Sequence, residues 1–232
     1  MPTSLRIFPT RDEAEIFLSG LMEGVLRLQL EQDVHAGLLL SGGSTPGPVY
    51  ERLSRADLDW SRVDIGLVDE RWVELGDEQS NAGLVSRTLL QNQAASAYFM
   101  PMKTPDPTAE AGAEQIEPRY GRLLDTGPLM VLGMGTDGHT ASWFPTIVRL
   151  EDIMDPDNEA AVAAIDATGA ALTGGVPNRI TVTGRALDSA SVTVLYITGE
   201  EKRRVLEDRS AGLPIHLAEY VLGERLVKVW AP

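Results

Sequence analysis

Residues 128–139 read PLMVLGMGTDGH, an apolar run that ends in a glycine-rich turn. The run from Pro128 to Leu132 has the length and composition of a buried strand. Glycines let the backbone turn sharply and approach a ligand closely. The turn ends on His139, and histidine is the side chain whose ordinary pKa lies nearest neutrality. We therefore expect a buried strand whose carboxyl end presents an imidazole that can take up and return a proton.

The order of strand, turn and helix recurs along the chain. Strands are predicted at 37–40, 63–68, 129–132, 180–183, 192–197 and 226–230, and helices at 11–31, after Ser80, at 108–124 with a break or new start near Pro118, and at 199–208. This alternation predicts an α/β fold, with a mainly parallel open sheet flanked by helices on both faces. We expect one domain over residues 1–232, because no repeat or long linker divides them. The fold of 151–178 stays open, although 161–167 is compatible with a strand.

The composition narrows the range of functions. The chain has no cysteine, which excludes disulfides, thiol catalysis and cysteine-based zinc sites. The formal net charge of −14 disfavours a nucleic-acid partner. No apolar run reaches the roughly 18 residues of a membrane span, and the N-terminus lacks a signal-peptide pattern, so we expect a cytoplasmic protein. An anionic substrate would have to be held by local cations against the overall charge.

Three turns follow predicted strands, at 41–46, 69–71 and 133–139. Ligands of open α/β sheets bind beyond the carboxyl ends of the strands, so these turns are expected to converge. The first turn offers backbone N–H groups and hydroxyls that suit a phosphate, through Gly43, Ser44 and Thr45. It matches neither nucleotide-binding fingerprint, and an ordinary turn is the alternative.

The other turns supply charged side chains whose roles the sequence leaves open. Arg71 either contacts a phosphate or forms a structural salt bridge with Asp69 or Glu70. Asp69 either acts as a base or holds its loop. Asp137 either orients the His139 imidazole or caps a helix.

Two further basic residues lie at the start of a predicted strand and of a predicted helix. Arg179 precedes a strand, and Lys202 lies in the first turn of a helix, where a nearby anion would explain a cation. A solvated or paired lysine is the alternative for Lys202. One histidine and one carboxylate are too few to argue for a metal site, so no metal is expected.

Taken together, the motifs resemble the 6-phosphogluconolactonase family within the wider glucosamine-6-phosphate isomerase/deaminase group. The matching stretches are LLLSGGSTP at 38–46, VDERWV at 68–73 with Ser80-Asn81, VLGMGTDGHTASWFP at 131–145, PNRITVT at 177–183 and YITGEEKRRVL at 196–206. Each motif is modest alone, but the ordered set is specific and spans most of the chain.

The resemblance implies hydrolysis of 6-phospho-D-glucono-1,5-lactone to 6-phosphogluconate, in the oxidative pentose phosphate pathway, without a cofactor or metal. It implies that His139 is the general base and that Asp137 positions it. It also places Gly43, Ser44, Thr45, Arg71, Arg179 and Lys202 in the phosphate and substrate pocket. The expected partner is a small phosphorylated sugar lactone, and the expected assembly is a monomer or small homo-oligomer.

Two positions bear on the reaction. Trp143 stands where the family commonly has a smaller aliphatic residue, and it either reshapes the pocket wall or fills the core. Phe144 stands where the deaminases have a glutamate that opens the sugar ring, and an apolar ring cannot move that proton. This favours lactone hydrolysis over a phosphosugar isomerase or deaminase; a non-catalytic sugar-phosphate-binding module is the other alternative.

Overall fold

Two sheets organise the chain in the computed structural model, which describes residues 4–232. The larger sheet has seven strands in the order β1-β10-β9-β6-β2-β3-β5, and every neighbouring pair in it runs parallel. Its strands are β1 (Leu5–Ile7), β2 (Ala36–Leu40), β3 (Val63–Leu67), β5 (Tyr98–Phe99), β6 (Leu129–Leu132), β9 (Val192–Thr198) and β10 (Leu226–Ala231). The predicted parallel α/β sheet is confirmed.

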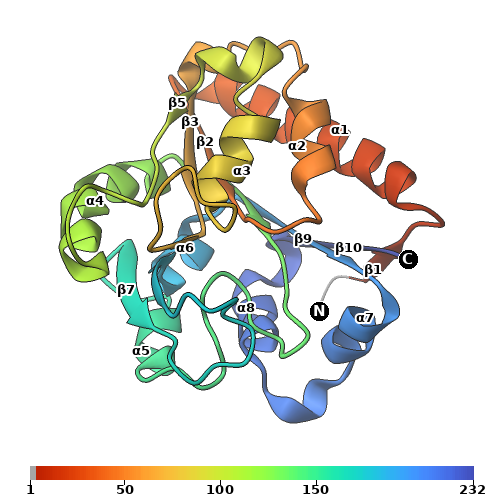
Figure 1. Cartoon of the computed structure of the whole chain (residues 1–232). Helices are drawn as coiled ribbons and strands as arrows, with labels where there is room; N and C mark the ends of the chain where they lie inside the picture. Colours follow the sequence, from red (N-terminus) through yellow and green to blue (C-terminus); the bar gives the residue numbers. More distant parts are fainter. Residues whose placement is uncertain (1–3) are drawn as a thin grey trace.

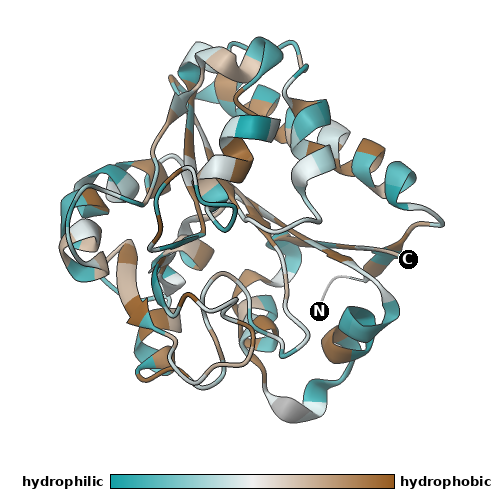
Figure 2. Ribbon diagram, in the orientation of Figure 1, coloured by the Kyte–Doolittle hydropathy of each residue, from teal (hydrophilic) through white to brown (hydrophobic). Residues whose placement is uncertain are grey.

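Helices cover both faces of this sheet, with α1 and α2 on one side and α6 and α8 on the other (Figure 1). The α-helices are α1 (Arg11–Gln32), α2 (Gly47–Leu53), α3 (Asn81–Thr88), α4 (Ala109–Leu124), α5 (Leu150–Met154), α6 (Gly184–Ser189), α7 (Glu200–Glu207) and α8 (Pro214–Leu222). Apolar residues concentrate on the strands and the inward helix faces, whereas the outer faces are polar (Figure 2). In the described part of the chain, no helix is long and apolar enough to span a bilayer.

Both α1 and the central strands follow directly from the sequence pattern. On α1, Leu18, Met22 and Leu26 recur every fourth residue and are buried, while the Thr10 hydroxyl caps the helix by accepting from the N–H of Glu13. All residues of β2 and β6 are buried, as expected for strands covered on both faces. The buried apolar side chains form one continuous cluster.

Helix α4 differs from the prediction, because it runs unbroken through Pro118. A proline inside a helix removes one backbone hydrogen bond and costs about 3 kcal/mol. The buried face of α4 offsets this cost. Tyr120, two residues later, is fully buried, donates its hydroxyl proton to the carbonyl of Met100 and accepts from the N–H of Leu67.

A second, antiparallel sheet with the order β4-β8-β7 was not anticipated as a unit. Its strands are β4 (Asp69–Arg71), β8 (Asn178–Val182) and β7 (Val162–Asp166). The strand considered at 161–167 is therefore present as β7, whereas 69–71 is a short strand as well as a turn. Because Asp69 pairs with Thr181 and Arg71 with Arg179, this sheet brings two distant parts of the sequence together.

The strand order fixes where a ligand can bind. From β2 the chain proceeds through β3 and β5 to one edge, whereas β6, β9 and β10 lie on the other side of β2. The order thus reverses between β2 and β6, which is where crevices form in open α/β sheets. The turns at 41–46 and 133–139 follow these two strands and lie side by side at that reversal.

Candidate active site

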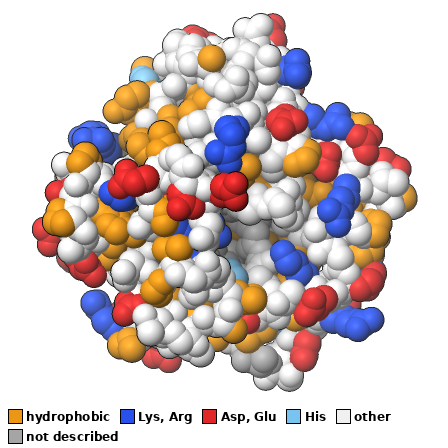
Figure 3. Space-filling model, viewed as in Figure 1, with side chains coloured by type: hydrophobic (Ala, Val, Ile, Leu, Met, Phe, Trp, Pro, Cys, Tyr) orange, Lys and Arg blue, Asp and Glu red, His pale blue; other side chains and the backbone are white. Residues whose placement is uncertain are grey.

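The three predicted turns converge on one cleft of about 270 Å³. Figure 3 shows a hollow in this face of the molecule, with basic side chains near its rim. The residues predicted from the sequence that line the cleft are Gly43, Ser44, Thr45, Asp69, Arg71, His139, Arg179 and Lys202. Asp137 is the one predicted site residue that does not line it; this side chain lies behind the imidazole.

His139 is oriented by Asp137. Its Nδ1 lies 2.6 Å from Oδ1 of Asp137, and its backbone N–H donates to the same oxygen over 3.1 Å. Within residues 4–232, the other ring nitrogen, Nε2, forms no hydrogen bond. Burial raises the pKa of Asp137, but the hydrogen bond and charge of His139 outweigh it, so the pKa lies below its ordinary value. The pair thus presents one imidazole nitrogen backed by a carboxylate.

Gly135 is required by the position of the imidazole. A Cβ at this position would lie 2.3 Å from the Cε1 and Nδ1 atoms of His139. The Gly135 N–H also donates to the carbonyl of His139 over 2.9 Å, which closes the turn. Only a glycine therefore lets the backbone pass this close to the ring.

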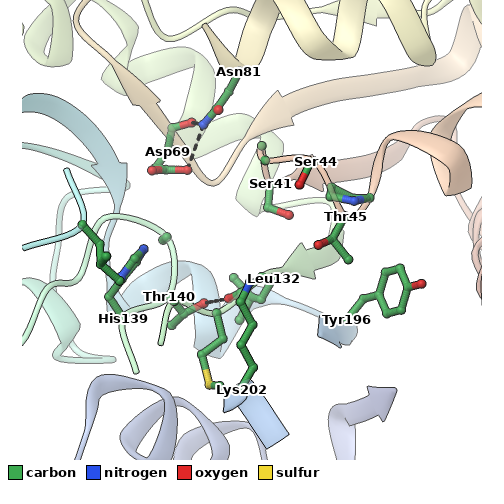
Figure 4. Close-up of a pocket in the computed structure, with 18 of the residues that line it drawn as sticks. Ser41, Ser44, Thr45, Asp69, Asn81, Leu132, His139, Thr140, Tyr196 and Lys202 are labelled. Carbon is green, nitrogen blue, oxygen red and sulfur yellow. Dashed lines mark hydrogen bonds between the residues drawn. The ribbon is translucent and has the colours of Figure 1, made fainter. Parts of the chain in front are cut away.

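The turn after β2 presents unpaired backbone donors. Gly43 has φ +88°, a left-handed conformation that favours glycine. No acceptor in the described chain receives a hydrogen bond from the backbone N–H of Gly43, Ser44 or Thr45. Figure 4 shows Ser44 and Thr45 on the side of the pocket away from His139. Adjacent N–H groups of this kind form a concavity that suits an anion.

Lys202 projects into the same pocket from the first turn of α7 (Figure 4). Its ammonium has no hydrogen bond or ion pair with any residue of the described chain. Burial lowers the pKa of Lys202, and the adjacent Glu201 opposes this shift only in part. A partly buried ammonium without a protein acceptor is costly unless an anion completes its surroundings.

Arg71 keeps part of its donor capacity. Its Nη1 donates to the carbonyl of Gln79 over 2.6 Å, whereas Nε is buried and has no acceptor in the part of the chain that the structure describes. The alternative of a salt bridge between Arg71 and Asp69 or Glu70 does not occur among the described residues. Glu70 instead accepts from the backbone N–H groups of Asn81 and Ala82 and fixes the start of α3.

Arg179 is buried, and its donors are directed at protein acceptors. Nε donates to the carbonyl of Val176 over 3.0 Å, and Nη2 donates to that of Thr173 over 2.6 Å. Nη1 lies 3.5 Å from Oδ2 of Asp69 and 3.4 Å from the hydroxyl of Ser142. Burial lowers the pKa of Arg179, and the charge of Asp69 raises it, with a net decrease.

Asp69 is held in the same network. Its Oδ2 accepts from the Ser142 hydroxyl over 2.5 Å. Its Oδ1 accepts from Nδ2 of Asn81 over 3.1 Å (Figure 4). These contacts correspond to the loop-holding alternative for Asp69, because both carboxylate oxygens already have donors. Ser142 was not singled out from the sequence, since nothing local shows that a serine at 142 meets a strand end at 69.

The structure shows where the side chains of Trp143 and Phe144 lie. Trp143 is fully buried and its Nε1 donates to the carbonyl of Val182 over 2.9 Å, so it fills the core and does not line the cleft. Phe144 is also fully buried, and its ring lies against the imidazole of His139. Over residues 4–232, no three His, Asp or Glu side chains are grouped so as to hold a metal ion.

The chain is similar in sequence to a family of known proteins. Residues 9–222 match the family model of glucosamine-6-phosphate isomerases/6-phosphogluconolactonase. A 6-phosphogluconolactonase of Rhizobium meliloti is 42% identical over 202 residues, which is 85% of each chain. One from Mesorhizobium japonicum is 35% identical over 97% of this chain and 94% of the relative.

A solved structure agrees with these matches. The crystal structure of a 6-phosphogluconolactonase from Shewanella baltica superposes with a TM-score of 0.86 at 33% identity. The alignment covers 99% of this chain and 98% of that one. By sequence and by fold, the chain belongs to the glucosamine-6-phosphate isomerase/6-phosphogluconolactonase family.

Proposed function

We propose that this protein hydrolyses 6-phospho-D-glucono-1,5-lactone to 6-phosphogluconate, in the oxidative pentose phosphate pathway. The similarity to 6-phosphogluconolactonases over nearly the whole chain supports this reaction. So does the pocket, which combines an oriented imidazole with donors that have no acceptor in the described part of the chain.

The proposal depends most on Lys202 and the backbone N–H groups of the 43–45 turn, which line the same pocket and have no acceptor among residues 4–232. A charged hydrogen bond contributes about 1.5–3 kcal/mol net. Several such bonds would hold a phosphate dianion despite the protein's net charge of −14. Arg71, whose buried Nε has no acceptor within residues 4–232, is the second cation we assign to this group.

With the phosphate held there, the lactone carbonyl is oriented toward His139. Nε2 of neutral His139 removes a proton from water while the water oxygen attacks C1. The carbonyl becomes a tetrahedral oxyanion, and Asp137 stabilises the imidazolium formed in this step. The intermediate then collapses: the C1–O5 bond breaks, and O5 takes the proton from Nε2. One water is consumed, and the imidazole returns to its neutral form.

The proposed steps use His139, Asp137 and the anion donors of the cleft, and we propose no cofactor or metal. A small phosphosugar lactone is the partner that the cleft suits. We further propose that the protein acts in the cytoplasm as a monomer or small homo-oligomer, without nucleic-acid or membrane partners.

The proposal is tested by supplying freshly generated 6-phosphogluconolactone and following its loss above spontaneous hydrolysis. In parallel, ammonia release is measured with glucosamine 6-phosphate. We expect lactone turnover and no ammonia, because Phe144 offers no group to move a proton on the sugar ring. Ammonia without lactone turnover would make the protein a deaminase. Binding of 6-phosphogluconate without either turnover would make it a sugar-phosphate-binding module.

A further inference from the structure

The Phe144 ring packs against both the imidazole of His139 and the guanidinium of Arg179. The ring centroids of Phe144 and His139 are 4.4 Å apart, with their planes inclined at 36°. The Cζ atom of Arg179 lies over the Phe144 ring, 5.1 Å from its centroid. The Phe144 side chain is inaccessible to solvent, so this arrangement is enclosed.

Arg179 is held at several points, which makes it a rigid support for the phenyl ring. The carbonyls of Thr173 and Val176 fix two of its nitrogens, and Asp69 lies beside the third. Asp69 is itself fixed by Ser142 and Asn81. The guanidinium therefore has a defined position before any ligand binds.

The imidazole has contacts of three kinds. Asp137 binds Nδ1, the backbone of Gly135 passes close to Cε1 and Nδ1, and Phe144 packs against the ring. Asp137 alone would permit the ring to tilt about its hydrogen bond. The Phe144 contact restricts that tilt and thereby sets the direction in which Nε2 points.

We infer that Phe144 and Arg179 are positioning residues for proton transfer: Arg179 fixes the Phe144 ring, and Phe144 fixes the imidazole plane of His139. Arg179 acts on the reaction through this contact rather than by binding the phosphate. Its Nε and Nη2 donate to backbone carbonyls and its Nη1 faces Ser142 and Asp69, so most of its donor capacity is used within the protein, whereas Lys202 and Nε of Arg71 have no acceptor in the described chain.

This inference rests on the proposed role of His139 and differs from a phosphate role in a measurable way. A positioning residue changes kcat, because the near-attack geometry is lost, and leaves binding of the phosphosugar unaltered. A phosphate ligand changes binding first. For Phe144→Leu and Arg179→Lys we expect kcat to fall roughly 10-fold, with the affinity for 6-phosphogluconate within about twofold of the original.

The control variant is Trp143→Phe. Trp143 is an equally buried aromatic neighbour that bonds to Val182 and lines no part of the cleft. It is expected to lower thermal stability while kcat stays unchanged. A loss of kcat in this control equal to that in Phe144→Leu would assign the effect to general loosening of the core and overturn the inference.

A second readout needs no turnover. The chain has three histidines, and His139→Ala assigns the ring nitrogen signals of His139 in 15N NMR spectra. We expect a single tautomer with the proton on Nδ1 in the original protein, and tautomer exchange or line broadening in Phe144→Leu and Arg179→Lys. Unchanged His139 signals in both variants would overturn the inference, even if one variant were too unstable for kinetics.

The kinetic outcomes separate the two proposals. An inactive His139→Ala with unaltered kcat in Phe144→Leu and Arg179→Lys would leave the proposed function intact and refute the positioning role. A large loss of 6-phosphogluconate affinity in Arg179→Lys at unchanged kcat would make Arg179 a phosphate ligand. Full activity of His139→Ala would refute the proposed mechanism itself.

Discussion

Oδ1 of Asp137 lies 2.6 Å from Nδ1 of His139, and the two residues are only two positions apart on one turn. Because the same oxygen also accepts from the His139 backbone N–H, the carboxylate fixes both the turn and the ring. The orientation of the base is therefore a local property of the Asp-Gly-His sequence. Under the inference above, only the plane of the imidazole ring depends on residues outside this turn, namely Phe144 and Arg179.

Replacing Asp137 with asparagine should lower kcat while leaving binding nearly unchanged. The neutral amide no longer stabilises an imidazolium, and it can favour the wrong tautomer. General base catalysis contributes about 10²–10⁴-fold, and we expect a loss of roughly 10- to 100-fold in kcat. Lactone kinetics and the inhibition constant of 6-phosphogluconate measure the two effects. An unchanged kcat would show that Asp137 serves only as a turn cap.

The same pair predicts a pH dependence of stability. The folded-state pKa of Asp137 lies below its ordinary value, so its contribution to stability is fully present above the unfolded-state pKa, about 4. That contribution is lost as pH falls through the folded-state pKa. The difference in Tm between the original protein and Asp137→Asn should therefore shrink as pH falls below about 4. A difference that grows as pH falls below about 4 contradicts this assignment.

Lys202 should determine affinity more than rate. Removing its ammonium in Lys202→Met deletes one charged hydrogen bond of about 1.5–3 kcal/mol, which corresponds to about 10- to 100-fold in the affinity for 6-phosphogluconate. Calorimetric titration measures this directly. Ser19→Ala on α1, outside the cleft, is a neutral control. Equal affinities of Lys202→Met and the original protein would exclude Lys202 from the phosphate site.

If Lys202 binds the phosphate, the affinity for 6-phosphogluconate should fall at alkaline pH. Burial lowers its pKa, so the ammonium is lost at a lower pH than for an exposed lysine. Affinity for 6-phosphogluconate should accordingly decline as pH rises through that pKa. Lys202→Arg should move the decline to higher pH, because arginine stays charged. If the decline occurs at the same pH in both proteins, another group is responsible.

Gly135→Ala should impair catalysis without unfolding the protein. The added methyl group would occupy space 2.3 Å from the imidazole, so the ring must move away from its place beside Asp137. A displacement of about 1 Å can cost about 100-fold in rate, and we expect a loss in kcat on that scale. Circular dichroism and 6-phosphogluconate binding verify the fold. Normal kcat would mean that the ring position is not critical.

Much of the architecture could be predicted because each apolar strand segment is followed directly by residues typical of a turn. Apolar runs before the turns at 41–46 and 133–139 predicted parallel strands, and the rule for carboxyl ends predicted that their turns meet. His139, Ser44 and Lys202 follow from this logic, since each is placed by the end of its own strand. The parts of the cleft that follow directly from one strand and its turn could therefore be predicted from local sequence.

The remainder depends on contacts that no local pattern encodes. The pairing of Arg71 with Arg179 in the antiparallel sheet joins residues more than 100 positions apart. Neither the enclosure of Arg179 by Asp69 and Ser142 nor the contact between Phe144 and His139 has a signature in spacing. The continuity of α4 through Pro118 likewise reflects the tertiary contacts of Tyr120, which override a local helix breaker.

The role of His139 as a base that does not itself bind the phosphate, which is held across the same cleft by Lys202 and the 43–45 turn, is tested by His139→Ala. Turnover of freshly generated 6-phosphogluconolactone and calorimetric binding of 6-phosphogluconate are measured on the same preparation. We expect a loss of roughly 10²–10⁴-fold in kcat, with the product bound as tightly as by the original protein. Retained turnover, or product binding lost in proportion to turnover, would contradict it.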